Sequence, residues 1–197
     1  MQINPRIAAE LEKNNGVITT ADIIKLGFSK QLLSQYVKYG KLERIRQGMY
    51  ILPDADHDDM FTLMLRSDNI IFSHNSALFL NSLSDRTPFI HTITIPNNTS
   101  LPSSLREECT CFYIKPELHQ LGLITQKTVF GNTVRCYNAE RTICDLLRSR
   151  KKCDDETVVA AIKNYAAYKN KDLNLLSQYS MVFKVNDELK RYMEVLL

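Results

Sequence analysis

Four polar side chains between Ser29 and Gly40 recur at the spacing of one helix face. They are Gln31, Ser34, Gln35 and Lys38, and the opposite side carries Leu32, Leu33, Tyr36 and Val37. Glutamine can make two hydrogen bonds to an adenine edge, serine can donate or accept, and lysine can reach guanine or phosphate. The pattern predicts a helix over 29–39 that reads the major groove of double-stranded DNA. Ser29, Lys30 and Tyr39 flank this face and suit backbone contacts.

A short hairpin with two arginines follows this helix. Segments 42–46 and 49–52 have strand character and flank Gln47 and Gly48, which favour a tight turn. Arg44 and Arg46 would share one strand face at a period of two residues, and a wing with arginines can contact phosphates or a narrow minor groove. The alternative is the solvated surface of a small helical domain. The order of the features along the chain favours DNA binding.

Helix-stop and helix-start residues place these side chains. Apolar residues at helical spacing predict a first helix that stops at residues 14–16, and Thr19 with Asp22 has the spacing of a capping box for a second helix. Gly27 ends that helix, and the serine before the third helix can cap it. Three helices and a hairpin are the order of a winged helix-turn-helix, which we assign to residues 1–53.

The remaining residues, 54–197, predict an α+β domain that ends in helices. Four aspartates between residues 54 and 59 indicate a linker and an acidic helix start. The expected elements are a helix over 59–66, a strand over 70–72, a helix over 75–83 capped by Ser73, strands over 89–95 and 109–114, a hairpin of 125–130 with 133–137, and helices over 139–148, 155–168, 173–183 and from 187 to the end. The predicted fold class is α+β, a winged helix-turn-helix followed by a mixed α/β domain.

Motifs for catalysis or for a metal are missing from this second region. Phosphate-binding glycine loops, zinc-protease motifs and nucleophile elbows are absent, and the five cysteines form no C-x-x-C pair. The histidines are scattered, and His74 favours a capping role at a helix start. Glu188-Leu189-Lys190 has the form of a nuclease motif, but its place in a terminal helix favours a solvated surface. We predict no enzyme activity, no cofactor and no metal site.

Two charged clusters mark the helix predicted over 139–148. Arg141 and Asp145 have the spacing of an i,i+4 ion pair that would orient the helix. The end of the helix carries the densest positive cluster in the chain: Arg148, Arg150, Lys151 and Lys152. Cations there complement the helix dipole, which accounts for one or two of them. Four cations in five positions predict a supplementary surface that contacts phosphates.

The formal charge of +3 is unevenly distributed. Residues 1–52 carry eight Lys and Arg against four Asp and Glu, residues 53–110 carry three against eight, and residues 111–197 carry fourteen against ten. The ends of the chain are therefore expected to meet a polyanion. Apolar runs fall short of the roughly 20 residues that cross a bilayer, and residues 1–11 lack the layout of a signal peptide. We expect a cytoplasmic protein with reduced thiols and no membrane partner.

Five blocks of the sequence resemble the AbiEi antitoxin family. Segments 16–22, 27–29 and 40–50 look like the family's N-terminal winged helix, and segments 71–78 and 137–147 look like two blocks of its C-terminal domain. The resemblance covers nearly the whole chain, and the last helices match by character more than by residue. It implies a transcriptional regulator of a bacterial abortive-infection toxin-antitoxin operon, with a role in phage defence. Under this resemblance, the alternative role for the cluster of Arg148, Arg150, Lys151 and Lys152 is an antitoxin surface.

The resemblance also implies partners. The antitoxin would repress its own promoter through the winged helix and oppose a nucleotidyltransferase toxin through the C-terminal domain, without a stable toxin complex, as type IV antitoxins do. A single winged helix gives modest affinity, so we expect two or more copies, and possible self-association, on repeated promoter sites. Two alternatives stay open: a DNA-targeted nuclease or nucleotidyl-transferring enzyme, and a transcription factor without a toxin partner.

Overall fold

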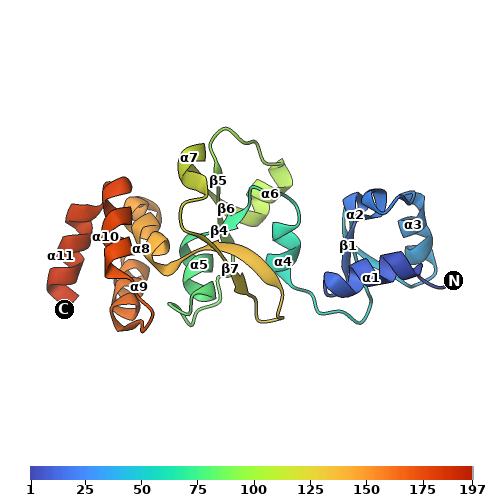
Figure 1. Ribbon diagram of the computed structural model, residues 1–197, viewed down its shortest axis with the longest axis horizontal. Helices are drawn as coiled ribbons and strands as arrows, with labels where there is room; N and C mark the ends of the chain where they lie inside the picture. Colours follow the sequence, from blue (N-terminus) through green and yellow to red (C-terminus); the bar gives the residue numbers. More distant parts are fainter. Residues whose placement is uncertain (197) are drawn as a thin grey trace. The chain divides into compact units, whose positions relative to one another are not determined.

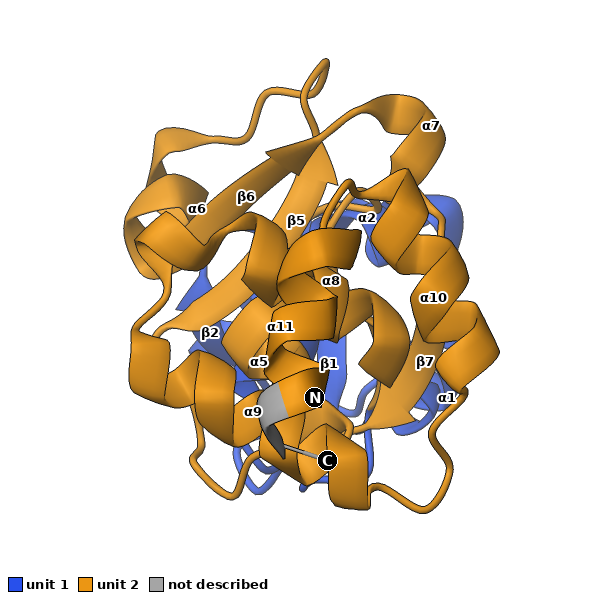
Figure 2. Ribbon diagram, turned by 90° about the vertical axis from the view of Figure 1, so that its left-hand side faces the viewer, with its two compact units in different colours: residues 1–62, 129–132 blue, residues 63–128, 133–197 orange. Residues whose placement is uncertain are grey.

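The computed structural model describes residues 1–196, which form two compact units (Figures 1 and 2). Unit 1 comprises Met1–Thr62 with the turn Val129–Asn132, and unit 2 begins with Leu63–Thr128 and continues from Thr133. Helices and strands occur in both units, so the α+β fold class is confirmed. These units are defined by how densely their residues contact one another, not by function. The functional division into residues 1–53 and 54–197 therefore stays a prediction.

Unit 1 is a winged helix-turn-helix. Its elements are α1 (Pro5–Lys13), β1 (Val17–Thr19), α2 (Thr20–Lys25), α3 (Gln31–Lys38), β2 (Glu43–Arg46) and β3 (Met49–Ile51). The strands form an antiparallel sheet in the order β1-β3-β2. The predicted order of three helices and a hairpin is confirmed. Strand β1 was not predicted, because three residues are too few for a recognisable alternation.

Side chains cap the first two helices of unit 1. At the start of α1, the Asn4 side chain accepts a hydrogen bond of 3.0 Å from the Arg6 backbone N–H. At the start of α2, the Asp22 N–H donates to Thr19 Oγ1 at 3.2 Å, and the Thr19 N–H donates to Asp22 Oδ2 at 3.0 Å. The predicted capping box is thus confirmed, and it satisfies N–H groups that a helix start otherwise leaves without partners.

One apolar core joins the helices and the sheet of unit 1. Its buried members are Ile7, Leu11, Ile18, Ile23, Leu33, Tyr36, Leu42 and Tyr50. Burying each aliphatic side chain of this size contributes about 1.5–3 kcal/mol. Because α1, α2, α3, β1 and β3 all contribute, the core holds α3 in a fixed orientation within the unit.

A mixed five-stranded sheet forms the base of unit 2. Its strands are β4 (Ile71–Phe72), β5 (His91–Pro96), β6 (Cys109–Ile114), β7 (Leu123–Lys127) and β8 (Thr133–Tyr137), in the order β6-β5-β4-β8-β7. Strand β4 is antiparallel to β5 and parallel to β8, and β5 is parallel to β6. Strands β7 and β8 form the predicted antiparallel hairpin. Strands β6 and β7 are the sheet edges.

The helices include three that the sequence did not predict. The predicted ones are found as α4 (Asp59–Met64), α5 (His74–Leu80), α8 (Ala139–Arg148), α9 (Asp155–Ala167), α10 (Leu173–Val182) and α11 (Asn186–Leu196). The additional ones are α6 (Ser103–Glu108), α7 (Pro116–His119) and the 3-10 helix η1 (Arg150–Lys152). Leu197, the end of the last predicted helix, lies outside the described residues.

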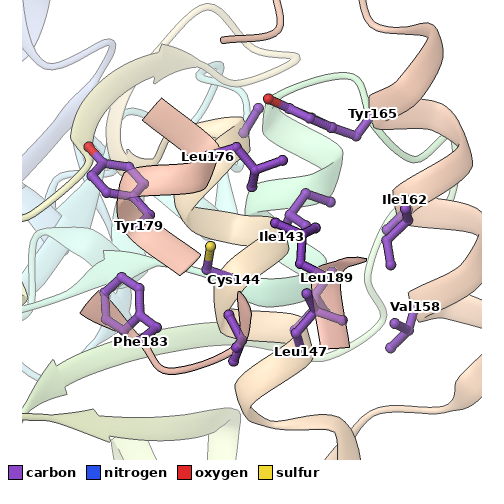
Figure 3. Packing of buried hydrophobic residues seen from close by; sticks show 14 of the residues in the cluster. Ile143, Cys144, Leu147, Val158, Ile162, Tyr165, Leu176, Tyr179, Phe183 and Leu189 are labelled. Carbon is purple, nitrogen blue, oxygen red and sulfur yellow. The ribbon is translucent and has the colours of Figure 1, made fainter. Parts of the chain in front are cut away.

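Helix α8 is the centre of the helical part of unit 2. It packs against α5, α9, α10 and α11, and nine of its ten residues are buried. Figure 3 shows Ile143 and Leu147 of α8 among side chains of the later helices, such as Val158 and Leu176. A helix surrounded in this way is normally apolar on all sides. The charged residues of α8 therefore need partners inside the protein.

Candidate nucleic-acid interface

The polar face of α3 is exposed. Gln31, Ser34, Gln35 and Lys38 are all exposed, whereas Leu33 and Tyr36 on the opposite side are buried. The prediction that Val37 lies on the buried side of the helix was wrong, because its side chain is 36% exposed. Val37 therefore extends the exposed surface beyond Ser34. A wheel assumes that apolar side chains all face the core, and here the core reaches only the side of the helix that holds Leu33 and Tyr36. The face combines hydrogen-bonding groups, one cation and one apolar side chain.

Two contacts fix the start and the inner side of α3. The Tyr36 hydroxyl accepts a hydrogen bond of 2.9 Å from the Asn4 backbone N–H, which ties α3 to the start of α1. Ser29 Oγ accepts from the Gln31 N–H at 3.3 Å, but α3 starts at Gln31 and its N-cap is Lys30, so the prediction that Ser29 caps this helix is wrong. Lys30, which directly precedes α3, and Tyr39, which follows it, are both exposed. The flanking residues predicted for backbone contacts are thus accessible at both ends of the helix.

The two wing arginines differ in their surroundings. Arg44 pairs with Tyr50 and Arg46 pairs with Met49, so a β-bulge between the arginines interrupts the alternation of side chains. The prediction that they share one strand face is therefore wrong. Arg44 is exposed and its Nε donates to the Arg46 carbonyl at 3.3 Å, while Arg46 is half-buried. A bulge depends on the pairing partner, so the strand sequence alone could not predict it.

The wing turn is attached to the helix-turn-helix by the backbone. Gly48 in the turn has a φ of +76°, a conformation that favours glycine, and its carbonyl accepts a hydrogen bond of 2.8 Å from the Thr20 N–H at the start of α2. The hydrogen bond joins the turn between β2 and β3 to the first residue of α2, directly after the cap residue Thr19. Wing and helices therefore form one rigid surface within unit 1.

A second charged region lies inside unit 2, where α8 carries a buried ion pair. Arg141 Nε donates to Asp145 Oδ2 at 3.0 Å, and both side chains are fully buried. The Arg141 guanidinium lies over the rings of Tyr137 at 4.1 Å and Phe183 at 4.2 Å. Burial raises the pKa of Asp145, and the two arginines at positions 141 and 148 oppose that rise. The predicted i,i+4 pair is confirmed and lies in the core of unit 2.

Carbonyl oxygens and a glycine complete the surroundings of this ion pair. Arg141 Nη1 donates to the carbonyls of Leu118 at 3.0 Å and Leu121 at 2.7 Å. Gly122 has a φ of +77°, and a Cβ atom there would lie 2.8 Å from the Arg141 Cβ. The chain segment before β7 thus supplies acceptors and room for the guanidinium.

His74 lies beside the end of α8. Its Nδ1 is 3.0 Å from Ser73 Oγ and its Nε2 is 3.1 Å from Ser149 Oγ, while its ring stacks on Phe112 with centroids 3.5 Å apart. Burial, reinforced by Arg148, lowers the pKa of His74 to about 3. Ser73 occupies the predicted N-cap position of α5, but its side chain contacts His74 and makes no cap hydrogen bond. His74 is the first residue of α5, and its side chain bonds to Ser73 and Ser149 instead of capping the helix.

A basin of about 1130 Å³ opens on unit 2 beyond α8, and we call it the cationic basin. Its lining includes the four cations of the predicted cluster: Arg148, Arg150, Lys151 and Lys152. It also includes Lys184. This residue could not be predicted as part of the cluster, because it lies 32 positions after Lys152 and no local pattern connects the two. The fold therefore gathers more positive charge at this place than the sequence cluster alone provides.

Aromatic rings and carboxylates hold the cations at the rim of the basin. Arg148 lies over the Phe183 ring at 5.7 Å, Arg150 over Tyr192 at 5.5 Å and Lys152 over Phe112 at 5.8 Å. In addition, Arg148 pairs with Asp145 at 3.2 Å and Arg150 pairs with Asp155 at 3.1 Å. These contacts limit the rotamers of three of the cations.

The described part of the chain shows neither a cluster of metal ligands nor a helix that could span a membrane. Within residues 1–196, no group of three or more His, Cys, Asp or Glu side chains could hold a metal ion. Glu188 and Lys190 lie on helix α11 rather than on a sheet strand, with Leu189 between them buried. In the same described part of the chain, no helix has the length and apolar character needed to cross a membrane.

The winged helix has a family match. Residues 5–53 match the model of a family described as transcriptional regulators, AbiEi antitoxins. The winged-helix segment is of the AbiEi regulator type. This confirms the family resemblance for the N-terminal quarter of the chain, where the matched family consists of transcriptional regulators of antitoxin type.

One solved structure extends the comparison to the whole chain. The RV2827C protein from Mycobacterium tuberculosis is similar in fold, with a TM-score of 0.53 and 14% sequence identity, over 97% of this chain and 79% of that chain. At this identity the similarity concerns the fold alone. No curated protein matches the sequence.

Proposed function

We propose that this chain is an autorepressing antitoxin of a bacterial toxin-antitoxin operon. Residues 1–53 bind the operon's promoter DNA, and residues 54–197 counteract a nucleotidyltransferase toxin without forming a stable complex with it. The observation that carries the DNA-binding part is the exposed polar face of α3, held by a buried core and flanked by the exposed Lys30 and Arg44. The family match of residues 5–53 supports the regulatory role.

The proposed contacts divide into base reading and backbone binding. Base edges are read by Gln31, Ser34, Gln35 and Lys38, and the apolar Val37 beside them suits a thymine methyl group. Backbone phosphates are bound by Ser29, Lys30, Tyr39, Arg44 and Arg46. Of the two arginines, the exposed Arg44 contributes more, because Arg46 is half-buried and its strand is bulged.

Binding of the full-length protein to DNA tests this division. Fluorescence anisotropy would compare the DNA upstream of the protein's own reading frame with random DNA of equal length. Gln35→Ala should weaken specific binding by about 5–100-fold and leave random DNA unaffected. Lys30→Ala should weaken both and lower the slope of log K against log salt by about 0.9.

Lys13→Ala is the matched control for these variants. Lys13 is an exposed lysine at the end of α1, outside the proposed interface, and its loss removes the same charge. The control should bind both DNAs nearly as the unchanged protein does. Equal effects of all three variants on specific and random DNA would contradict the assignment.

The number of protein copies on the promoter is a separate part of the proposal. One winged helix covers a short site, so two or more copies bind repeated sequences. Titration of a promoter fragment, followed by mass measurement of the complex, should give at least two chains per fragment. A single chain on a non-repeated site would contradict this part and leave the contacts of α3 in place.

The antitoxin role is tested in cells that express the protein of the adjacent reading frame, which the proposal expects to be a nucleotidyltransferase toxin. Expression of the full-length protein should restore growth, and the Gln31→Ala, Gln35→Ala double variant should still restore it while losing promoter repression. Purification of either protein should not retain the other. Absence of rescue would favour a transcription factor without a toxin, and stable co-purification would refute neutralisation without a complex.

A further inference from the structure

We propose that the cationic basin binds a nucleoside oligophosphate, such as a nucleoside di- or triphosphate. The proposal concerns unit 2 alone and does not depend on DNA binding by α3. Its link to the proposed function is that it names a ligand for unit 2, the unit to which the proposal assigns most of the antitoxin domain. The basin's volume of about 1130 Å³ accommodates a ligand of nucleotide size, since small-molecule sites usually enclose about 300–1,000 Å³.

Several positively charged groups in the basin are available to an anion. Lys151 and Lys184 line it and form no ion pair among the described residues, and Lys152 contacts only an aromatic face. Arg148 also lines the basin with a side chain that is 28% exposed, although it pairs with Asp145 and its Nε is buried without a hydrogen-bond partner in this part of the chain. Phosphate oxygens are the acceptors that such donors bind most strongly.

The cations are held in place before any ligand arrives. Phe112, Phe183 and Tyr192 each lie under one of the charged side chains at 5.5–5.8 Å. A flexible lysine or arginine loses less conformational freedom on binding when a ring already limits its rotamers. His74 adds no charge at neutral pH, because its pKa lies at about 3. The positive charge of the site thus comes from the arginines and lysines alone.

The shape of the charged region favours a compact anion over a long nucleic acid. Asp154, Asp155 and Glu188 line the same basin and limit the positive region to a short stretch. These carboxylates repel an extended phosphodiester backbone along its length, whereas a short oligophosphate concentrates its charge on two or three groups that the cations can contact. Tyr113, which lines the basin and is 47% exposed, offers a ring on which a base can stack.

Isothermal titration of the full-length protein with ATP, GTP, inorganic tripolyphosphate and adenosine tests the proposal. The double variant Lys151→Glu, Lys152→Glu should bind both nucleotides and tripolyphosphate about 10–100-fold more weakly, since charged hydrogen bonds are lost. Tyr113→Ala should weaken nucleotide binding about 5-fold or more and leave tripolyphosphate unchanged. Adenosine alone should bind weakly.

The matched control is Lys163→Glu, Lys169→Glu, which reverses two exposed lysines of unit 2 outside the basin. It should bind nucleotides as the unchanged protein does. Three results would each overturn the proposal: no saturable nucleotide binding at millimolar concentration, equal weakening in the control, or binding of single-stranded oligonucleotides that ATP does not displace. Loss of promoter binding by α3 variants would leave the nucleotide titrations unchanged, which separates this proposal from the DNA-binding one.

Discussion

Asp145→Asn is expected to destabilise unit 2 strongly. The replacement keeps the size of the side chain and removes the charge that faces Arg141, so a fully buried guanidinium loses its carboxylate. Breaking a buried ion pair by removing one partner costs about 3–5 kcal/mol. Arg141 keeps the Leu118 and Leu121 carbonyls as acceptors, which places the expected loss near the lower end, at about 3 kcal/mol.

The loss can be converted into a melting temperature. Unit 2 contains about 130 residues, and an unfolding entropy of about 2.1 cal/mol/K per residue gives roughly 0.27 kcal/mol/K. A loss of 3 kcal/mol then lowers Tm by about 11 °C. Urea denaturation and scanning calorimetry would measure the free energy of unfolding and Tm separately.

The double variant Arg141→Met, Asp145→Leu serves as the control. It removes both charges and fills their space with apolar atoms, a change that is often nearly neutral for a buried pair. It should therefore lose less stability than Asp145→Asn alone. The reasoning is refuted if Asp145→Asn loses under about 1 kcal/mol, or if the double variant is as unstable as the single one.

Three further predictions follow from local contacts. The folded pKa of His74, about 3, lies below its ordinary value of 6.5, so stability is lost as the pH falls below 6.5, by roughly 2–3 kcal/mol between pH 7.5 and 4.5. Urea denaturation of His74→Gln should lack that loss. A hydrogen bond from the Cys109 thiol, 3.7 Å away, lowers the pKa of Cys111 to about 7, so iodoacetamide should label Cys111 at neutral pH. Cys109→Ala should move the midpoint of labelling against pH upward, and an unchanged midpoint, measured by mass spectrometry, would contradict this. Thr19→Ala should cost about 1 kcal/mol by removing the cap of α2, and an unchanged urea midpoint would argue against the capping box.

Local features of the fold could be predicted from the sequence. The capping box at Thr19 and Asp22, the glycines that follow α2 and α3, and the alternation of residue types in β5 all depend on neighbouring residues. The i,i+4 spacing of Arg141 and Asp145 predicted their ion pair for the same reason. The family resemblance of the winged helix rests on such local blocks.

Features that depend on distant partners could not be predicted. Strand β1 is recognisable only through its pairing with β3, more than 30 positions later, and the bulge beside Arg46 exists only in the register with Met49. Val37 is exposed because the core leaves one side of α3 uncovered. Lys184 joins the basin through the packing of the last helices, and nothing in its neighbouring residues indicates this role.

Gly122 is tied to the ion pair of α8 although it lies in a connecting segment. Any side chain there would both strain a left-handed backbone and press on Arg141, 2.8 Å away. In a random mutagenesis screen for variants that no longer rescue growth from the toxin, Gly122 should therefore tolerate no other residue, while neighbouring loop positions accept many. A single loop position that tolerates no substitution would resemble a binding residue in such a screen. Its cause would instead be the close contact with Arg141.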